Sequence, residues 1–255
     1  MSGEPTTAIV LRCVEFSETS LIVSMLTRDF GRISAMAKGA RRPKGPFEGA
    51  LDLLSVCRIV VIRKQGDKLD LLTEAKLHRR FRCGERSIPR LYAGYAVAEL
   101  LRLLTDDDEP QSDVYDLTIA TLAQIDGEGD PAASLLFFEI QLLRLLGHNP
   151  STDVCTGCGI DLAIDLGRGE ATHVFSLDGG GLVCGDCRSR SRGNIVIDTR
   201  SLSGLITLAD PATRLPVKVS ADAYGPIRAL VSRYVQSIAG REPRMQAFVP
   251  TEIRV

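Results

Sequence analysis

The first third of the chain consists of short apolar runs that predict β-strands. Residues 8–15 and 19–27 are rich in β-branched and aliphatic side chains, and residues 31–38 alternate between apolar and polar positions with a period of two. Two longer runs, 53–64 and 67–80, are joined by a Gln-Gly-Asp sequence that is typical of a hairpin turn. Five strands joined by short connections over about 75 residues predict a small β-barrel.

From about residue 84 the spacing of apolar residues changes to that of α-helices. One run has a complete set of boundary signals, with Asp130 as the N-cap, Pro131 in the first turn and Gly147 as the stop. Pro89 suits the first turn of another run, and Ser112 suits the N-cap of a third. The pattern predicts a helical domain, with helices at 88–104, 112–125, 130–147, 199–209 and 220–240.

Four of the seven cysteines form two Cys-x-x-Cys pairs, in VCTGCG and LVCGDC. Thiolates are preferred ligands of zinc in closed tetrahedral sites, and glycines allow the backbone to turn tightly beneath the metal. The 25 residues between the pairs exceed the usual ~15–20, but a hairpin at 172–183 can take up the excess. The spacing predicts one structural Zn²⁺ in an insertion at about 151–192, with four ligands: Cys155, Cys158, Cys184 and Cys187.

Other uses of these cysteines fit the sequence less well. Disulfides are rare in cytoplasmic chains, and no strand–helix–strand context for a redox pair is visible. A catalytic zinc site keeps an open position, whereas four thiolates close it, and the deaminase and His-Glu-x-x-His signatures are absent. His173 could replace one thiolate, although a polar spacer role is favoured. Cys13, Cys57 and Cys83 are interpreted as small buried hydrophobic residues.

Charge is distributed unevenly along the chain, although the net charge is only −1. Residues 1–82 carry a net charge of +6 and the remainder carries −7. A basic first third indicates an anionic partner for the barrel. No apolar run approaches the ~20 residues that span a bilayer, and no secretory signal precedes the first strand, so we expect a cytoplasmic protein.

The connection at 39–50 is long, basic and rich in Gly and Pro, so it cannot be a strand. Dense charge in a loop is often only a solvated surface, but arginines also bind phosphates in a bidentate way, and small barrels bind single strands through basic grooves. No P-loop motif occurs. The candidate DNA-binding residues are Lys38, Arg41, Arg42 and Lys44, with Arg63 and Lys64 near the following hairpin.

Catalytic residues are not evident in the sequence. Three scattered histidines do not assemble a nucleophilic triad. The run Asp106–Glu109 could hold a metal in a nuclease, but four adjacent carboxylates between two helices are more often a solvated turn. We therefore predict a protein that is not an enzyme.

The assembled features resemble the RecO family of bacterial recombination mediators. The resemblance covers nearly the whole chain and is carried by VLRCVEFSETSLIVSMLTRDFGRISAMAKGARRPKG, LLRLLGHNPSTDVCTGCG and FSLDGGGLVCGDC. It implies an α+β, multi-module fold: an N-terminal OB-fold barrel at 1–82, followed at 83–255 by an α-helical domain with an inserted four-cysteine zinc module. Some family members lack the four cysteines, whereas this chain has all of them.

The resemblance also implies function and partners. RecO-like proteins bind single-stranded DNA, anneal complementary strands and work with RecR to load RecA onto DNA coated by single-strand-binding protein. The acidic tail of single-strand-binding protein is expected to contact the helical domain, and double-stranded DNA is a further candidate ligand. The location that follows is cytoplasmic and nucleoid-associated, with no membrane and no small-molecule substrate. The alternative is a zinc-stabilised protein–protein adaptor without direct DNA binding.

Overall fold

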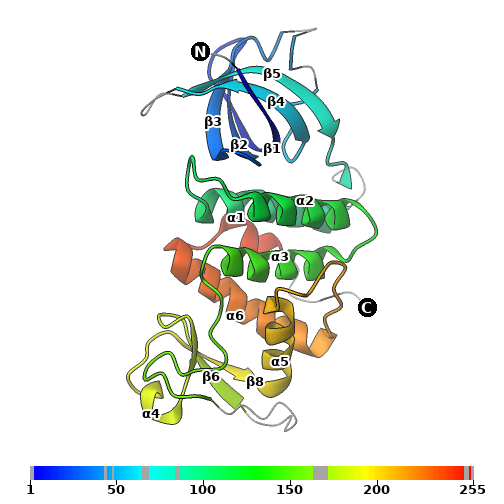
Figure 1. The fold of residues 1–255 in the computed structure, drawn as a ribbon. Coiled ribbons are helices and arrows are strands. Elements are labelled where there is room, and N and C mark those ends of the chain that lie inside the picture. The colour runs from blue at the N-terminus through cyan, green and yellow to red at the C-terminus, as the bar shows by residue number, and fades with distance from the viewer. Residues whose placement is uncertain are drawn as a thin grey trace. The chain divides into compact units, whose positions relative to one another are not determined.

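The computed structural model describes residues 3–42, 45–47, 49–64, 69–83, 87–162, 172–249 and 253. The chain forms two compact units, Met1–Leu122 and Ala123–Val255 (Figure 1). The boundary between these units lies within a helix, and the domain division at 82/83 stays a prediction. Among the described residues, no helix is both long and apolar enough to cross a bilayer.

The first unit begins with a closed, OB-like five-stranded barrel, as the apolar runs predict. Its strands follow the order β1-β2-β3-β5-β4, and β3 and β5 form the one parallel pair of that order. The turn predicted between the last two strands falls on residues outside the described ones. The strands are β1 (Glu4–Glu15), β2 (Leu21–Thr27), β3 (Gly31–Ala37), β4 (Val56–Ile62) and β5 (Asp70–Arg79).

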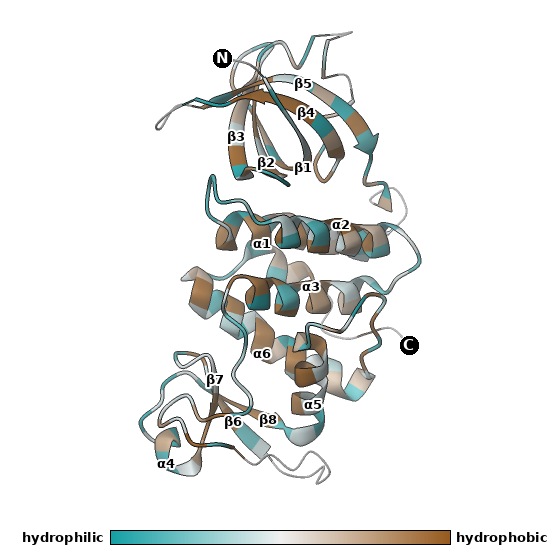
Figure 2. Cartoon of the chain, viewed as in Figure 1, coloured by the Kyte–Doolittle hydropathy of each residue, from teal (hydrophilic) through white to brown (hydrophobic). Residues whose placement is uncertain are grey.

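Aliphatic side chains fill the barrel interior. Along β3, buried residues alternate with partly exposed ones, which confirms the period of two in the sequence. Apolar residues are prominent along β4, where the exposed Arg58 interrupts them (Figure 2). Buried positions from all five strands contribute to this core, among them Val10, Val23, Met25, Ile33, Ile59 and Leu72.

Two helices follow the barrel along the chain. Helix α1 (Ile88–Leu104) has the predicted bounds and carries Pro89 in its first turn, where a missing N–H costs no hydrogen bond. Helix α2 (Ser112–Asp126) begins at Ser112 itself, so the residue predicted as its cap is the first residue of the helix. The acidic run Asp106–Glu109 lies between these two helices.

The second unit contains three longer helices around a buried ion pair. Asp130 caps α3 (Pro131–Leu145) by accepting a hydrogen bond from the Ala133 amide at 2.7 Å, as predicted. Buried Glu139 of α3 pairs with buried Arg228 of α6 (Ala221–Ala239). Desolvation raises the pKa of the Glu139 carboxyl, although Arg228 opposes the shift. The other helices are α5 (Thr199–Ala209) and the short 3₁₀ helix η2 (Arg244–Phe248).

A three-stranded sheet lies between α3 and α5 in the sequence. It has the order β7-β6-β8, and the predicted hairpin provides β6 (Thr172–Ser176) and β7 (Gly181–Val183). The short helix α4 (Gly185–Arg188) follows β7. Strand β8 (Asn194–Asp198) was not predicted, because its three apolar residues are consecutive and form too short a run within polar surroundings.

Candidate metal centre and nucleic-acid interface

The four cysteines of the two pairs gather in one cluster. Their Sγ atoms all lie within 4.8 Å of one another. Cys155 and Cys187 are buried, Cys184 is half-buried and Cys158 is exposed. The predicted set of metal ligands is thus brought together in space, with one thiol at the protein surface.

Each pair forms a tight knuckle. In the first, the Gly159 amide donates to the Cys155 carbonyl at 2.8 Å, and Gly159 has a φ of 74°, which favours glycine. In the second, Cys184 is the N-cap residue of α4, and the Cys187 amide donates to the Cys184 carbonyl at 3.2 Å. Because the backbone turns within each Cys-x-x-Cys pair, both thiols of a pair point toward the same cluster.

Gly157 is a structural requirement of the cluster that the motif alone did not reveal. A Cβ atom at this position would lie 2.9 Å from both Sγ and Cβ of Cys187. That separation is shorter than van der Waals contact, so a side chain would push the two knuckles apart. The sequence signal is the glycine between the cysteines of the first pair.

The thiols need a cation before all four can ionise. The Cys184 amide donates to Cys155 Sγ at 3.2 Å, and this hydrogen bond lowers the pKa of the Cys155 thiol to about 6 despite desolvation. Hydrogen bonding with Cys158, and then with Cys184, raises the pKa of Cys187 to about 12. A bound divalent metal ion would offset part of the four negative charges and so stabilise the thiolates.

The arrangement fits a closed metal centre. The four clustered sulfur donors are the number that a tetrahedral zinc site takes, so a bound zinc ion would keep no open coordination position. His173, the alternative ligand, instead places Nε2 3.1 Å from the Thr199 hydroxyl oxygen. The cluster is therefore compatible with zinc and can hold the chain together at this point.

The predicted basic loop follows β3 at one end of the barrel. Lys38, Arg41 and Arg42 are exposed, whereas Lys44 lies outside the described residues. The Arg41 amide donates to the Thr19 carbonyl at 3.1 Å, and the Arg42 amide donates to the Gly39 carbonyl at 3.0 Å. The first hydrogen bond holds the loop backbone against the β1–β2 turn and the second closes a turn within the loop, while the charged side chains face solvent.

The cations of this loop are weakly engaged. The Arg41 guanidinium lies 3.1 Å from the Glu15 carboxylate, but the two side chains are 43% and 70% exposed, so water screens the pair. Among the described residues, neither Lys38 nor Arg42 has a carboxylate partner. A phosphate could therefore approach these groups without first breaking a strong ion pair.

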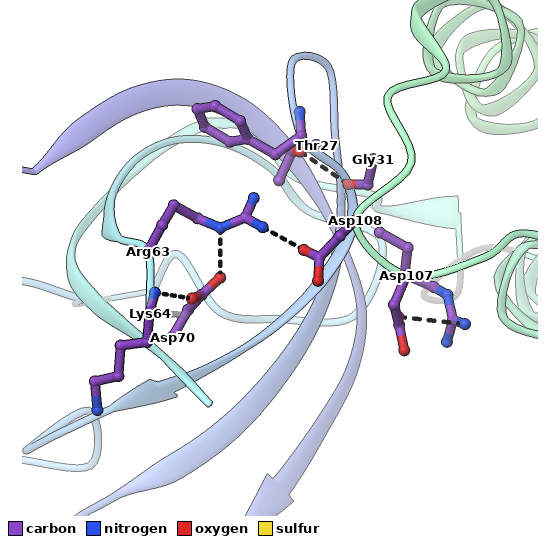
Figure 3. Close-up of polar contacts among 9 residues, drawn as sticks. Thr27, Gly31, Arg63, Lys64, Asp70, Asp107 and Asp108 are labelled. Carbon is purple, nitrogen blue, oxygen red and sulfur yellow. Dashed lines mark hydrogen bonds and ion pairs between the residues drawn. The ribbon is translucent and has the colours of Figure 1, made fainter. Parts of the chain in front are cut away.

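Arg63 has different surroundings. Its side chain is 25% exposed. The guanidinium lies 5.2 Å from the centroid of the Phe30 ring and pairs with both Asp70 and Asp108 (Figure 3). The Lys64 amide donates to Asp70 at 2.8 Å, while the Lys64 side chain extends away from these carboxylates. Asp70 and Asp108 thus offset the charge of Arg63, whereas the Lys64 ammonium takes no part in these ion pairs.

The acidic run between α1 and α2 is more than a solvated turn. Asp107 lies 3.3 Å from Arg32, and Asp108 pairs with Arg63. The Asp108 amide donates to the Arg32 carbonyl at 2.9 Å, so the backbone also joins the barrel. The carboxylates face arginines and do not form a metal cluster among the described residues.

Gly31 allows this close approach. Its φ is 69°, and a Cβ atom would overlap the Glu109 backbone carbonyl. The Thr27 hydroxyl donates to the Gly31 carbonyl at 2.8 Å and fixes the turn from within the barrel (Figure 3). In the sequence, Gly31 has the signal of an ordinary turn glycine and gives no indication of the distant carboxylates.

The three remaining cysteines are not all buried. Cys57 and Cys83 are buried as predicted, but Cys13 is exposed, so the prediction was wrong for Cys13. The Cys13 thiol donates to the Leu51 carbonyl at 3.1 Å. Desolvation, and then the nearby charge of Asp52, raises the pKa of Cys13 to about 11, so its thiol stays protonated near neutral pH.

Comparison with protein families accounts for both halves of the chain. The model described as "Recombination protein O N terminal" matches residues 1–81, and the model described as "Recombination protein O C terminal" matches residues 85–246. The chain belongs to the RecO family. The resemblance noted in the sequence is thereby confirmed.

Individual RecO proteins align over nearly the full chain. The DNA repair protein RecO of Rhodopirellula baltica is 48% identical over 270 residues, which cover 96% of this chain and 98% of that relative. The RecO proteins of Anaeromyxobacter dehalogenans strain 2CP-C and Symbiobacterium thermophilum are each 31% identical. Those alignments cover 93% and 95% of this chain, and 86% and 95% of the relatives.

Proposed function

We propose that this chain is a non-catalytic recombination mediator in DNA repair. It binds single-stranded DNA, anneals complementary strands and, together with RecR, helps to load RecA onto DNA coated by single-strand-binding protein. The observation that carries the proposal is the match of both RecO family models to a chain whose OB-like barrel carries exposed cations. Annealing breaks no covalent bond, so it needs none of the catalytic residues that the sequence lacks.

The DNA-binding surface is the end of the barrel that carries Lys38, Arg41 and Arg42. Lys44 belongs to the same loop. Arg63 and Lys64 lie toward the other end of the barrel and would extend the contact there, Arg63 when its pair with Asp108 opens. Phosphate contacts release counterions, so the affinity should fall with salt and depend little on base sequence. Double-stranded DNA can use the same phosphate contacts.

The binding test compares two double substitutions that remove equal charge. Fluorescence anisotropy with a labelled single-stranded oligonucleotide measures Kd at several salt concentrations. Arg41→Ala with Arg42→Ala should weaken binding and reduce the slope of log K against log salt by roughly 1.4, or about 0.7 per lost contact. Arg200→Ala with Arg233→Ala, on exposed positions of the second unit, should leave the slope unchanged. Equal losses of affinity and slope in the two double variants would show that the loop does not contact DNA.

The binding test also separates the mediator from the alternative, a zinc-stabilised adaptor that contacts only proteins. Wild-type protein that fails to bind the oligonucleotide at low salt would favour the adaptor. Incubation of DNA with Mg²⁺ or Mn²⁺ tests the nuclease interpretation of the acidic run, and we expect no cleavage. The mediator works in the cytoplasm at the nucleoid, where its DNA ligand lies.

Zinc is the metal that we propose for the four-cysteine cluster, with one ion per chain. The ion would stabilise the second unit, because ligand binding and folding are coupled. Elemental analysis of protein purified without chelator should give stoichiometric zinc, and a value near zero would contradict the assignment. Cys184→Ser should lose the metal and lower the melting temperature, while the barrel retains DNA binding.

Protein partners complete the proposal. RecR and the acidic tail of single-strand-binding protein are the expected partners, with the tail on the helical domain. The test is annealing of complementary oligonucleotides coated by the cognate single-strand-binding protein or by a form without its tail. Annealing should be faster on the complete coat. Equal rates would remove tail recognition but leave DNA binding by the barrel intact.

A further inference from the structure

Phe16 is an exposed aromatic residue at the basic end of the barrel. It directly follows β1, and 58% of its surface is exposed, although phenylalanine usually lies in a core. Neighbouring Val14 is 39% exposed, so apolar surface extends along this end of the strand. Neither residue takes part in the metal centre or in the contacts with the acidic run.

The turn that carries Phe16 is well defined. The Phe16 amide donates to the Ser20 carbonyl at 3.0 Å, and the Ser17 amide donates to the same oxygen at 3.3 Å. The Ser20 amide in turn donates to the Ser17 hydroxyl at 3.2 Å. These bonds fix the backbone on both sides of the turn, so the ring is presented from an ordered support.

The same turn is joined directly to the basic loop. The Arg41 amide bonds to Thr19, inside the turn, at 3.1 Å. The Arg41 side chain reaches Glu15, the residue before Phe16, also at 3.1 Å. An exposed ring and a cluster of exposed cations therefore lie at one end of the barrel, on two segments held together by hydrogen bonds.

We propose that Phe16 is a base-stacking residue for single-stranded DNA whose phosphates contact Lys38, Arg41 and Arg42. Single-strand-binding surfaces combine a basic track with aromatic rings, because every base has a face on which a ring can stack. In a duplex those faces are covered by neighbouring bases, so Phe16 would favour single strands. The inference rests on the proposed function and adds the residue that distinguishes the two forms of DNA.

The absence of tryptophan from this chain allows a direct test. Phe16→Trp introduces a single indole whose fluorescence should be quenched when oligo(dT) is added at low salt. Phe248→Trp is the matched control, because Phe248 is 55% exposed but lies in the second unit. Its emission should stay unchanged by the same oligonucleotide. Quenching of both variants, or of neither, contradicts stacking at Phe16.

Affinity provides the second test. Phe16→Ala should weaken binding of single-stranded DNA by roughly five- to a hundredfold, while the slope against salt stays unchanged because no cation is lost. Binding of duplex DNA should not change, and Phe16→Tyr should restore wild-type affinity. An unchanged Kd for the alanine variant overturns the inference.

The outcomes distinguish failure of the inference from failure of the proposed function. If the wild-type chain binds no oligonucleotide at low salt, the mediator proposal itself fails. If the wild type binds with the expected salt dependence but substitution of Phe16 changes neither the fluorescence nor the affinity, the stacking inference is wrong and the proposed function stands. Because the ring is largely exposed, all three Phe16 variants should keep the wild-type melting temperature, which excludes unfolding as the cause of a loss of binding.

Discussion

The two ends of the barrel carry arginines in opposite environments. At the β2–β3 turn, Arg32 and Arg63 face carboxylates of the acidic run. At the other end of β3, roughly 20 Å away for seven residues of strand, Arg41 has only a solvated partner, and Arg42 has no carboxylate partner among the described residues. The net charge of +6 in residues 1–82 therefore includes arginines at the paired end whose charge carboxylates already offset. At the other end the cations remain available to DNA.

The difference teaches that basic residues in one barrel serve two purposes. At the paired end the arginines attach the loop between α1 and α2, and ion pairs with that loop offset their charge. At the solvated end the backbone alone fixes the loop, so the side chains remain available for an anion. Substitutions at the two ends can separate these two purposes.

The largest effect is expected from glycine substitutions at the two ends of β3. Gly31 and Gly39 both have positive φ, at 69° and 72°. Gly31→Ala adds overlap with the Glu109 backbone to the conformational strain, so it should cost at least about 3 kcal/mol of unfolding free energy. Gly39→Ala should cost only about 1–2 kcal/mol, because its Cβ would lie 3.5 Å from Arg42 Cδ. Urea denaturation measures both, and equal losses would show that the close approach of Gly31 to the Glu109 backbone adds nothing to stability.

Local patterns predicted the elements of the fold but not their contacts. The period of two along 31–38 and the cap at Asp130 fixed β3 and α3 because both signals act within a few residues. Barrel closure depends on the parallel pairing of β3 with β5, two strands between which a long loop and β4 intervene in the sequence, and no local signal encodes it. The barrel was therefore predicted from the number of strands.

The candidate sites differ in the same way. The cysteine cluster was predicted with all four ligands, because a knuckle is a local motif whose spacing reports its geometry. The pairing of Arg63 with Asp108 joins residues 45 positions apart, and the acidic run alone looked like a solvated turn. The exposure of Phe16 was not foreseen either, since the sequence does not show where β1 leaves the barrel core.

A smaller loss of stability is expected when an arginine is removed. Arg63→Ala leaves buried Asp70 without its charged partner and removes the contact with Asp108, so it should cost about 1–3 kcal/mol. Arg42→Ala at the solvated end should change stability by less than about 0.5 kcal/mol. The urea midpoints of both variants provide the comparison, and a larger loss for Arg42→Ala would reverse the assignment of the two ends.

Opening the paired end should raise DNA affinity. Asp108→Asn removes the charge that faces Arg63, and asparagine tolerates the φ of 61° at this position. At low salt the Kd for single-stranded DNA should fall by about two- to fivefold, the effect of one exposed pair. Asp106→Asn is the matched control, since it removes the same charge from the same loop. Identical gains would mean that net charge, and not release of Arg63, is responsible.

The smallest effect is expected from Arg28 and Asp116, which form a 2.9 Å ion pair within the first unit. Their side chains are 52% and 54% exposed, so solvent screens the attraction and the coupling should be below about 0.5 kcal/mol. Arg32 is only 20% exposed in its pair with Asp107, so that pair should couple more strongly. Double-mutant cycles with alanine, followed by urea denaturation, measure both couplings. Equal coupling energies for the two pairs would show that burial of Arg32 does not strengthen its attachment to the acidic run.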